Sequence, residues 1–280
     1  VGVIGAGTMG SGIAQAFAVT DGYEVVLCDI TEEFAAGGKK KIEKSLSKQV
    51  AKGRMEQAKM DEVLAKITTG LNDKVADCDL IVEAALEKMD LKKELFGKLQ
   101  TICKKDAIFA SNTSSLSLTE MSQGLDRAIV GMHFFNPAPV MKLVEVTSGA
   151  HTTPESVAKI IEITKEIGKV PVEVNEAPGF VVNKILIPMI NEAADLLDTG
   201  VASAEGIDTA KGEDDFMPFR NIFAEWHARD TSRKIRAIFG ARTAAGKHVT
   251  GALPYGYLHD PDDRQKWILD EEAAPVVKRI

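Results

Sequence analysis

The first ten residues, VGVIGAGTMG, restrict the fold of this chain more than any other stretch. A short β-branched run, typical of a buried parallel strand, leads into a GxGxxG turn. In such a turn the first glycine permits the bend, the second leaves room for a diphosphate, and the third lets the following helix pack against the strand. The helix N-terminus then offers N–H groups to the phosphates. The candidate cofactor-binding residues here are Gly5, Gly7, Thr8, Met9 and Gly10.

A carboxylate follows the second predicted strand at the distance that a dinucleotide site requires. Residues 23–28 are predicted to form this strand, and Asp29 lies 19 residues after Gly10. An acidic residue about 20 positions beyond the glycines accepts hydrogen bonds from the adenosine ribose hydroxyls. Because a carboxylate would repel a 2′-phosphate, the sequence favours NAD over NADP. The alternative is a surface aspartate that simply ends a strand.

Strands and helices alternate along residues 1–177, which predicts an α/β fold with a doubly wound sheet of the Rossmann type. Further strands are expected at 80–85, 107–110, 128–132, 143–146 and 170–174, and helices at 11–19, 32–53, 56–66, 91–99 and 154–168. Ligands of such sheets bind at the carboxyl ends of the strands. We therefore interpret residues 1–177 as the NAD-binding domain.

A second, helical domain is expected to begin at Pro178, where the alternation stops. Residues 180–197 form a long apolar run, in which Pro188 predicts a kink. This run is the expected first helix of a domain that we place at 178–212.

The composition changes abruptly at the end of that region. Residues 1–212 contain 21 lysines and 2 arginines, whereas residues 213–280 contain 4 lysines and 7 arginines. Such a shift indicates a boundary of origin or of role. We therefore expect the helical domain to be truncated near Gly212 and to be followed by an unrelated C-terminal segment, a helix and then loops.

A histidine at the end of a predicted strand is the main candidate for chemistry. His133 holds this position, and Glu145 lies twelve residues further on. An imidazole can take up a proton near neutral pH, and a carboxylate on its second nitrogen fixes the tautomer and stabilises the charged form. The spacing alone also fits a packed histidine with a glutamate nearby by chance. Ser114 and Asn136 are candidates to hydrogen-bond a reacting oxygen, or are ordinary turn residues.

The totals exclude several classes of function. The net charge of −7 gives no indication of a nucleic-acid binder. Cys28, Cys78 and Cys103 form no CxxC and no metal-ligand spacing, so we expect buried free thiols and no metal site. No run of 18 apolar residues occurs, and the sequence begins directly in a predicted strand. We therefore expect a cytoplasmic protein that does not contact membranes.

Residues 1–211 resemble the L-3-hydroxyacyl-CoA dehydrogenase family. The resemblance rests on five motifs, VGVIGAGTMGSGIAQ, LIVEAALE, IFASNTSSL, GMHFFNPAPVMKLVEV and PGFVVNKIL. It implies oxidation of the 3-hydroxyl of an acyl-CoA by NAD, or the reverse reduction. It also implies that His133 is the catalytic base and that Glu145 orients it.

The same resemblance implies roles for other residues. Ser114 and Asn183 would contact the substrate or transition state during catalysis, and Asn136 would bind the substrate. Asp29, Glu87, Lys92 and Ser114 would surround NAD. Lys52 and the lysine-rich helix 32–53 would lie near the phosphates of CoA. The family is homodimeric, and most of the segment expected to build the dimer surface is replaced after Lys211.

Residues 213–280 instead resemble an internal fragment of a large serine recombinase, in stretches such as DFMPFRNI and PYGY. Residues 229–247 contain six basic residues and one acidic residue, so this stretch is either the one candidate for contact with DNA phosphates or a solvated helix face. Three hypotheses follow: a dehydrogenase whose turnover is impaired by the changed C-terminal region, a DNA-binding fusion protein, or an NAD-binding module without turnover.

Overall fold

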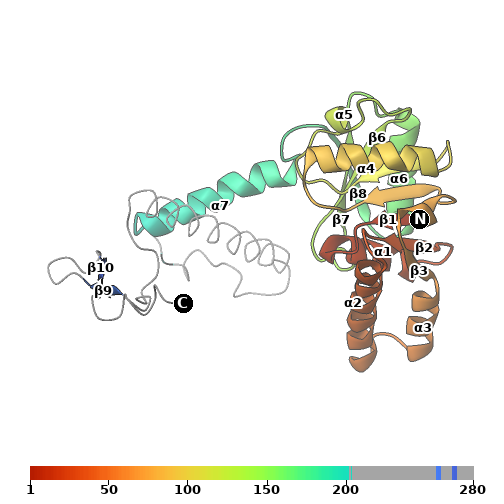
Figure 1. The fold of residues 1–280 in the computed structure, drawn as a ribbon, viewed down its shortest axis with the longest axis horizontal. Helices are drawn as coiled ribbons and strands as arrows, with labels where there is room; N and C mark the ends of the chain where they lie inside the picture. Colours follow the sequence, from red (N-terminus) through yellow and green to blue (C-terminus); the bar gives the residue numbers. More distant parts are fainter. Residues whose placement is uncertain (202, 204–256, 260–266, 270–280) are drawn as a thin grey trace. The chain divides into compact units, whose positions relative to one another are not determined.

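The computed structural model describes residues 1–201, 203, 257–259 and 267–269. The chain divides into two compact units, Val1–Pro218 and Phe219–Ile280. Figure 1 shows the described helices and strands in colour. Two of the sequence predictions, the helix after residue 213 and the basic stretch 229–247, lie outside the described residues.

One eight-stranded sheet organises the first unit, with the strand order β3-β2-β1-β4-β5-β6-β7-β8. β1 to β6 run parallel, β7 is antiparallel to β6, and β8 is parallel to β7. The strand order reverses between β1 and β4, since β2 and β3 extend the sheet on one side of β1 and β4 to β8 on the other. This reversal confirms the predicted doubly wound Rossmann sheet. The strands are β1 (Gly2–Ile4), β2 (Val25–Cys28), β3 (Ile67–Gly70), β4 (Leu80–Glu83), β5 (Ile108–Ser111), β6 (Ile129–Phe134), β7 (Leu143–Ser148) and β8 (Val170–Asn175).

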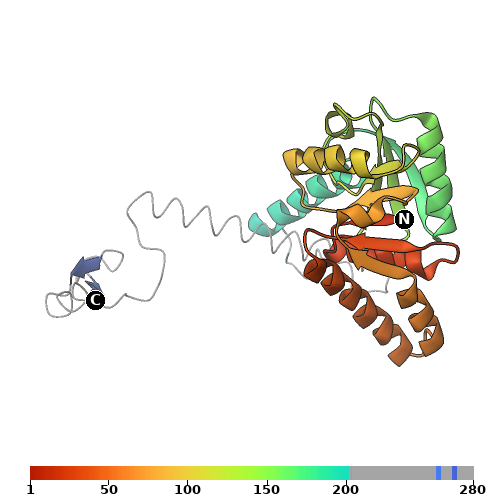
Figure 2. The same cartoon turned by 45° about the vertical axis from the view of Figure 1, so that its right-hand side comes forward.

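Helices connect these strands and cover both faces of the sheet (Figures 1 and 2). They are α1 (Thr8–Val19), α2 (Glu32–Ala51), α3 (Gln57–Ala65), the 3-10 helix η1 (Asn72–Val75), α4 (Met89–Ile102), α5 (Leu118–Met121) and α6 (Pro154–Glu166). A further helix, α7 (Val182–Asp198), follows β8. The sequence did not predict η1 or α5, because four residues are too few to show a helical period. A side-chain hydroxyl still marks the start of α5, since Ser117 accepts a hydrogen bond from the N–H of Glu120.

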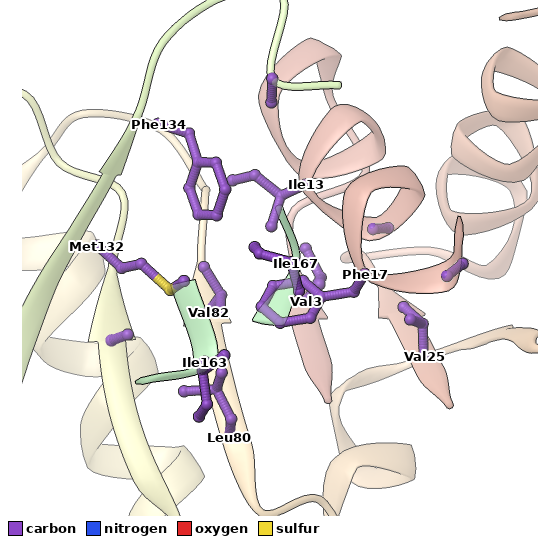
Figure 3. Close-up of a cluster of buried hydrophobic side chains, with 14 of the residues drawn as sticks. Val3, Ile13, Phe17, Val25, Leu80, Val82, Met132, Phe134, Ile163 and Ile167 are labelled. Atoms are coloured by element: carbon purple, nitrogen blue, oxygen red, sulfur yellow. The ribbon is translucent and has the colours of Figure 1, made fainter. Parts of the chain in front are cut away.

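The core lies in two layers, one on each face of the sheet. Alternate strand residues face opposite sides, so that Val3 belongs to one hydrophobic cluster and Ile4 to the other. The first cluster contains side chains of α1, α2, α3 and α6, and Figure 3 shows Ile13 and Phe17 of α1 among its side chains. The second contains side chains of α4 and α5. This packing holds the carboxyl ends of the parallel strands β1 to β6 at one edge of the sheet.

The three cysteines are free and buried, as predicted. Burial raises the pKa of Cys28 to about 12 and that of Cys103 to about 11. At neutral pH these thiols therefore stay protonated and behave as small core residues.

The segment after β8 begins the region that the sequence predicted to be helical. α7 runs through Pro188 and buries Leu186 and Ile190 on one side, one helical turn apart. Among the described helices none is long and apolar enough to cross a membrane. In the second unit, β9 (Tyr257–His259) pairs antiparallel with β10 (Trp267–Leu269), where the sequence predicted loops.

Candidate active site

The glycine-rich turn and Asp29 lie side by side at the carboxyl edge of the sheet. The N–H of Ala6 donates to Asp29 Oδ2 at 2.6 Å, and the N–H of Ile30 donates to Oδ1 at 2.7 Å. These bonds fix the carboxylate at the end of β2, next to the turn between β1 and α1. The structure thus brings together the two features that predicted a dinucleotide site.

The glycines of the turn differ in the space around them. A Cβ atom on Gly10 would lie 1.7 Å from the carbonyl oxygen of Gly5, so only glycine allows α1 to start this close to the turn. A Cβ atom on Gly7 would meet no heavy atom within 4 Å. Gly7 therefore borders open space beside the N-terminus of α1, where a diphosphate of a dinucleotide fits.

A cavity of about 470 Å³ opens next to this turn. Gly7 and Asp29 line it on one side, and Glu33, Lys40 and Lys41 of α2 on the other. Its size and its carboxylates suit the adenosine portion of NAD. Lys41 also donates from Nζ to the carbonyl oxygen of Ala6 at 3.1 Å, which ties α2 to the turn.

Asp29→Asn should weaken NAD binding about tenfold, since hydrogen bonds to a charged group are worth about 1.5–3 kcal/mol. The amide still offers an oxygen to the N–H of Ala6, so the turn should keep its shape. Loss of the negative charge should also tighten NADP binding. Fluorescence titration with both cofactors measures the ratio of the two Kd values, with Glu32→Gln, an exposed change on α2, as control. An unchanged ratio would refute the role of Asp29.

His133 and Glu145 are direct partners across the antiparallel pair β6 and β7. Residues opposite each other in such a ladder point to the same face of the sheet. His133 Nδ1 therefore meets Glu145 Oε2 at 2.7 Å, and both side chains are almost fully buried. The rings of Phe135 and Phe180 pack against the imidazole. This reversed strand explains how two residues twelve positions apart form a pair.

The second oxygen of Glu145 holds the start of α7. Oε1 accepts hydrogen bonds from the N–H groups of Val181 at 3.1 Å and Val182 at 2.9 Å. Burial raises the pKa of Glu145, but the hydrogen bonds from His133 and from these two N–H groups outweigh it and bring the pKa below its usual 4.5. The carboxylate is thus kept ionised beside the histidine. The sequence did not reveal these backbone donors, because any residue type can supply them.

Glu145→Gln should remove part of the acid sensitivity of folding. Because the pKa of Glu145 is lowered in the folded state, the carboxylate contributes stability above pH 4.5 that is lost as the pH falls through the folded-state pKa. Urea unfolding at about pH 6 and about pH 3 should show the variant less stable than the parent, by an amount that shrinks at the lower pH. The control is Glu173→Gln, an exposed change on β8. A difference that grows in acid would contradict the lowered pKa.

A buried ion pair supports the loop after β5. Lys92 is 1% exposed, and its Nζ lies 2.5 Å from Glu83 Oε1 and 3.3 Å from Glu87 Oε2. Glu87 Oε1 accepts hydrogen bonds from Thr113 Oγ1 at 2.5 Å and the N–H of Ser114 at 2.9 Å. Burial raises the pKa of Glu87, but Thr113, Lys92 and the N–H of Ser114 together lower it.

Two of the predicted cofactor residues, Glu87 and Lys92, therefore sit in one network with Ser114. The ammonium of Lys92 is covered by protein, so this residue supports Glu87. Glu83 was not among the predicted site residues, although a charged residue at the end of an apolar strand indicates a buried polar site.

The other predicted site residues, Asn136, Asn183 and Lys52, lie in three different parts of the structure. Asn136 follows β6 and lines a second cavity of about 190 Å³, together with Thr8 of α1 and Ser45 of α2. Asn183 lies in the first turn of α7, directly after the N–H groups that bind Glu145. Lys52 is an exposed residue that ends α2. The 20-residue helix α2 is about 30 Å long. Lys52 lies at its C-terminal end, so its position in α2 does not place it beside His133.

No cluster of His, Cys, Asp or Glu that could hold a metal ion occurs in the described part of the chain. The site combines a glycine-rich turn of the dinucleotide-binding type, the carboxylate of Asp29 beside it and a buried His–Glu pair. These are the elements of an NAD-dependent dehydrogenase, in which a histidine moves a proton and the nicotinamide carries the hydride.

Comparisons with known proteins agree with this class. The family model for the 3-hydroxyacyl-CoA dehydrogenase NAD binding domain matches residues 1–177, and the model for the C-terminal domain of the same enzymes matches residues 179–215. A 3-hydroxybutyryl-CoA dehydrogenase of Clostridioides difficile is 48% identical over 211 residues, which cover 74% of this chain and 75% of that protein. The human mitochondrial hydroxyacyl-coenzyme A dehydrogenase is 43% identical over 217 residues, covering 74% and 69%.

A solved structure gives the same result. The (S)-3-hydroxybutyryl-CoA dehydrogenase of Ralstonia eutropha is 42% identical, with a TM-score of 0.70 over 73% of each chain. This chain belongs to the 3-hydroxyacyl-CoA dehydrogenase family. It is an oxidoreductase, and its cofactor is NAD. The family similarity extends to residue 215, slightly beyond the boundary predicted near Gly212.

Proposed function

We propose that this chain oxidises the 3-hydroxyl group of a short-chain 3-hydroxyacyl-CoA to a ketone, or reduces acetoacetyl-CoA in the reverse direction. The observation that carries the proposal is the buried hydrogen bond between His133 and Glu145 at the carboxyl edge of an NAD-binding sheet. Relatives named as 3-hydroxybutyryl-CoA dehydrogenases support the choice of substrate.

His133 acts as the base in this proposal. An ionised carboxylate can only accept hydrogen bonds, so Glu145 requires a proton on Nδ1 and leaves the lone pair of Nε2 for the substrate. The hydroxyl proton moves to Nε2, and the C3 hydrogen leaves with its electron pair, so that the C3–O bond becomes a carbonyl. Bound NAD supplies the acceptor for that hydride. Glu145 then stabilises the imidazolium that has formed.

Polar residues around the pair complete the proposed site. Ser114 and Asn183 would hydrogen-bond the reacting oxygen, and Asn136 would bind the acyl portion. Glu87 would contact the cofactor, with Lys92 behind it. Lys52 would meet the phosphates of CoA at the far end of α2.

We assign the NAD-binding domain to residues 1–177 and the start of the helical domain to 178–212. The family models match residues 1–177 and 179–215, and we interpret the remaining sequence as an unrelated segment. On that interpretation, we propose that turnover and dimer formation are impaired more than NAD binding.

The decay of NADH absorbance with acetoacetyl-CoA tests the proposal directly. Steady oxidation of NADH that depends on both protein and acetoacetyl-CoA would support it. Binding of NADH without turnover, and with no binding of acetoacetyl-CoA, would instead indicate an NAD-binding module. The DNA-binding alternative rests on residues 229–247, and a gel shift of the full chain that shows no salt-dependent retention of DNA would exclude it.

A further inference from the structure

Lys169, the residue before β8, is a buried cation whose bonds run to a neighbouring loop. Its Nζ donates to the carbonyl oxygens of Ala138 at 2.7 Å, Pro139 at 3.2 Å and Met141 at 2.7 Å. The side chain is buried, and burial lowers the pKa of Lys169. An ammonium group has three N–H donors, and these three carbonyls match that number.

The loop that Lys169 binds joins the strand of His133 to the strand of Glu145. It packs on α1 from the other side, where a Cβ atom on Gly12 would lie 3.1 Å from Pro139 Cδ and 3.2 Å from Ala138 Cβ. The same loop forms one wall of the cavity of about 190 Å³ that Asn136 lines. The loop thus lies between α1 and Lys169 and borders that cavity.

Buried carbonyl groups need donors, and the sequence of this loop limits what the backbone can supply. Two of its residues, Pro137 and Pro139, have no N–H group. The N–H groups of Val140 and Met141 both donate to the carbonyl of Pro137. The carbonyls of Ala138, Pro139 and Met141 instead accept hydrogen bonds from Lys169, so the side chain of one residue fixes this loop.

We propose that Lys169 is a positioning residue that fixes this loop and so shapes the acyl-CoA-binding cavity beside Asn136. The inference rests on the proposed function for the identity of the ligand. The His133–Glu145 pair is held separately, by the β6–β7 ladder and by α7. Loss of Lys169 should therefore affect binding of acyl-CoA more than the chemical step or the binding of NADH.

Kinetics of Lys169→Met test this division. Methionine keeps the length of the side chain and removes all three donors. We expect the KM for acetoacetyl-CoA to rise about tenfold, with kcat and the Kd for NADH each changed less than about threefold. Lys165→Met, an exposed change at the end of α6, is the matched control and should leave all three constants unaltered. Lys169→Gln, which keeps two donors, should give an intermediate KM and replaces the methionine variant if that protein does not fold.

Hydrogen exchange of the full chain gives a second readout that does not require turnover. In Lys169→Met or Lys169→Gln, peptides covering residues 137–142 should exchange faster, while those covering the glycine-rich turn should not change. Absence of turnover in the parent protein would count against the proposed function, and the exchange result would still decide whether Lys169 holds the loop. Unchanged exchange in the loop, or an unchanged KM in an active variant, would overturn the inference.

Discussion

Replacing His133 with glutamine should lower kcat for the reduction of acetoacetyl-CoA by about 10²–10⁴-fold, the usual contribution of a general acid or base. Glutamine keeps a polar group that can still hydrogen-bond Glu145, so the fold should survive the change. The Kd for NADH should stay within about twofold, since the cofactor lies against the turn and Asp29. Absorbance assays of NADH oxidation measure kcat, and fluorescence titration measures the Kd for NADH.

His151→Gln is the control for this experiment, because His151 is exposed in the turn between β7 and α6. It should leave kcat and the Kd for NADH unchanged. If His133→Gln retained kcat within about threefold of the parent, another group would have to move the proton, and the proposed mechanism would be wrong.

Alanine at Gly7 and alanine at Gly10 should fail in different ways. At Gly7 the added methyl group meets open space, so the thermal midpoint should not fall, but the methyl group occupies the room needed by the diphosphate. We expect the Kd for NAD to rise about a hundredfold or more, equivalent to about 3 kcal/mol. At Gly10 the methyl group would overlap the carbonyl of Gly5, which should cost about 3 kcal/mol or more of folding free energy.

Thermal melts and NAD titrations of both variants separate the two effects. Gly97→Ala on α4, where an added Cβ atom also meets nothing within 4 Å, is the control and should be neutral or slightly stabilising. A Gly7→Ala protein that binds NAD as well as the parent does would contradict the proposed place of the diphosphate. A Gly10→Ala protein of parental stability would contradict the close approach of α1 to the turn.

The fold was predictable because it follows from local sequence patterns. The short β-branched strand, the glycine turn and the apolar faces of the helices each have a period that a single sequence reveals. The functional pair was predictable in identity, since the sequence places His133 at the end of a predicted strand. Its geometry was not, because the spacing to Glu145 does not show that β7 returns antiparallel with those two residues in register.

The sequence did not predict the contacts between side chains and backbone groups that lie far away along the chain. Glu145 binds N–H groups that lie 36 and 37 residues further along the chain, and Lys169 binds carbonyls about 30 residues before it. Backbone donors and acceptors are the same for almost every residue type, so no sequence pattern marks them. Lys52 is the opposite case, because a resemblance suggests its role while the structure places it as an exposed residue at the C-terminal end of α2.

The carboxylate of Glu145 links the protonation of His133 to the position of α7, because it binds both. One oxygen serves the imidazole and the other serves the first N–H groups of α7. Thermodynamic reciprocity then requires that whatever draws α7 away from Glu145 also changes the proton affinity of the His133–Glu145 pair, and that protonation of the pair changes the hold on α7 by the same free energy. The pH dependence of the His133–Glu145 pair therefore changes with the strength of the contact between Glu145 and the start of α7.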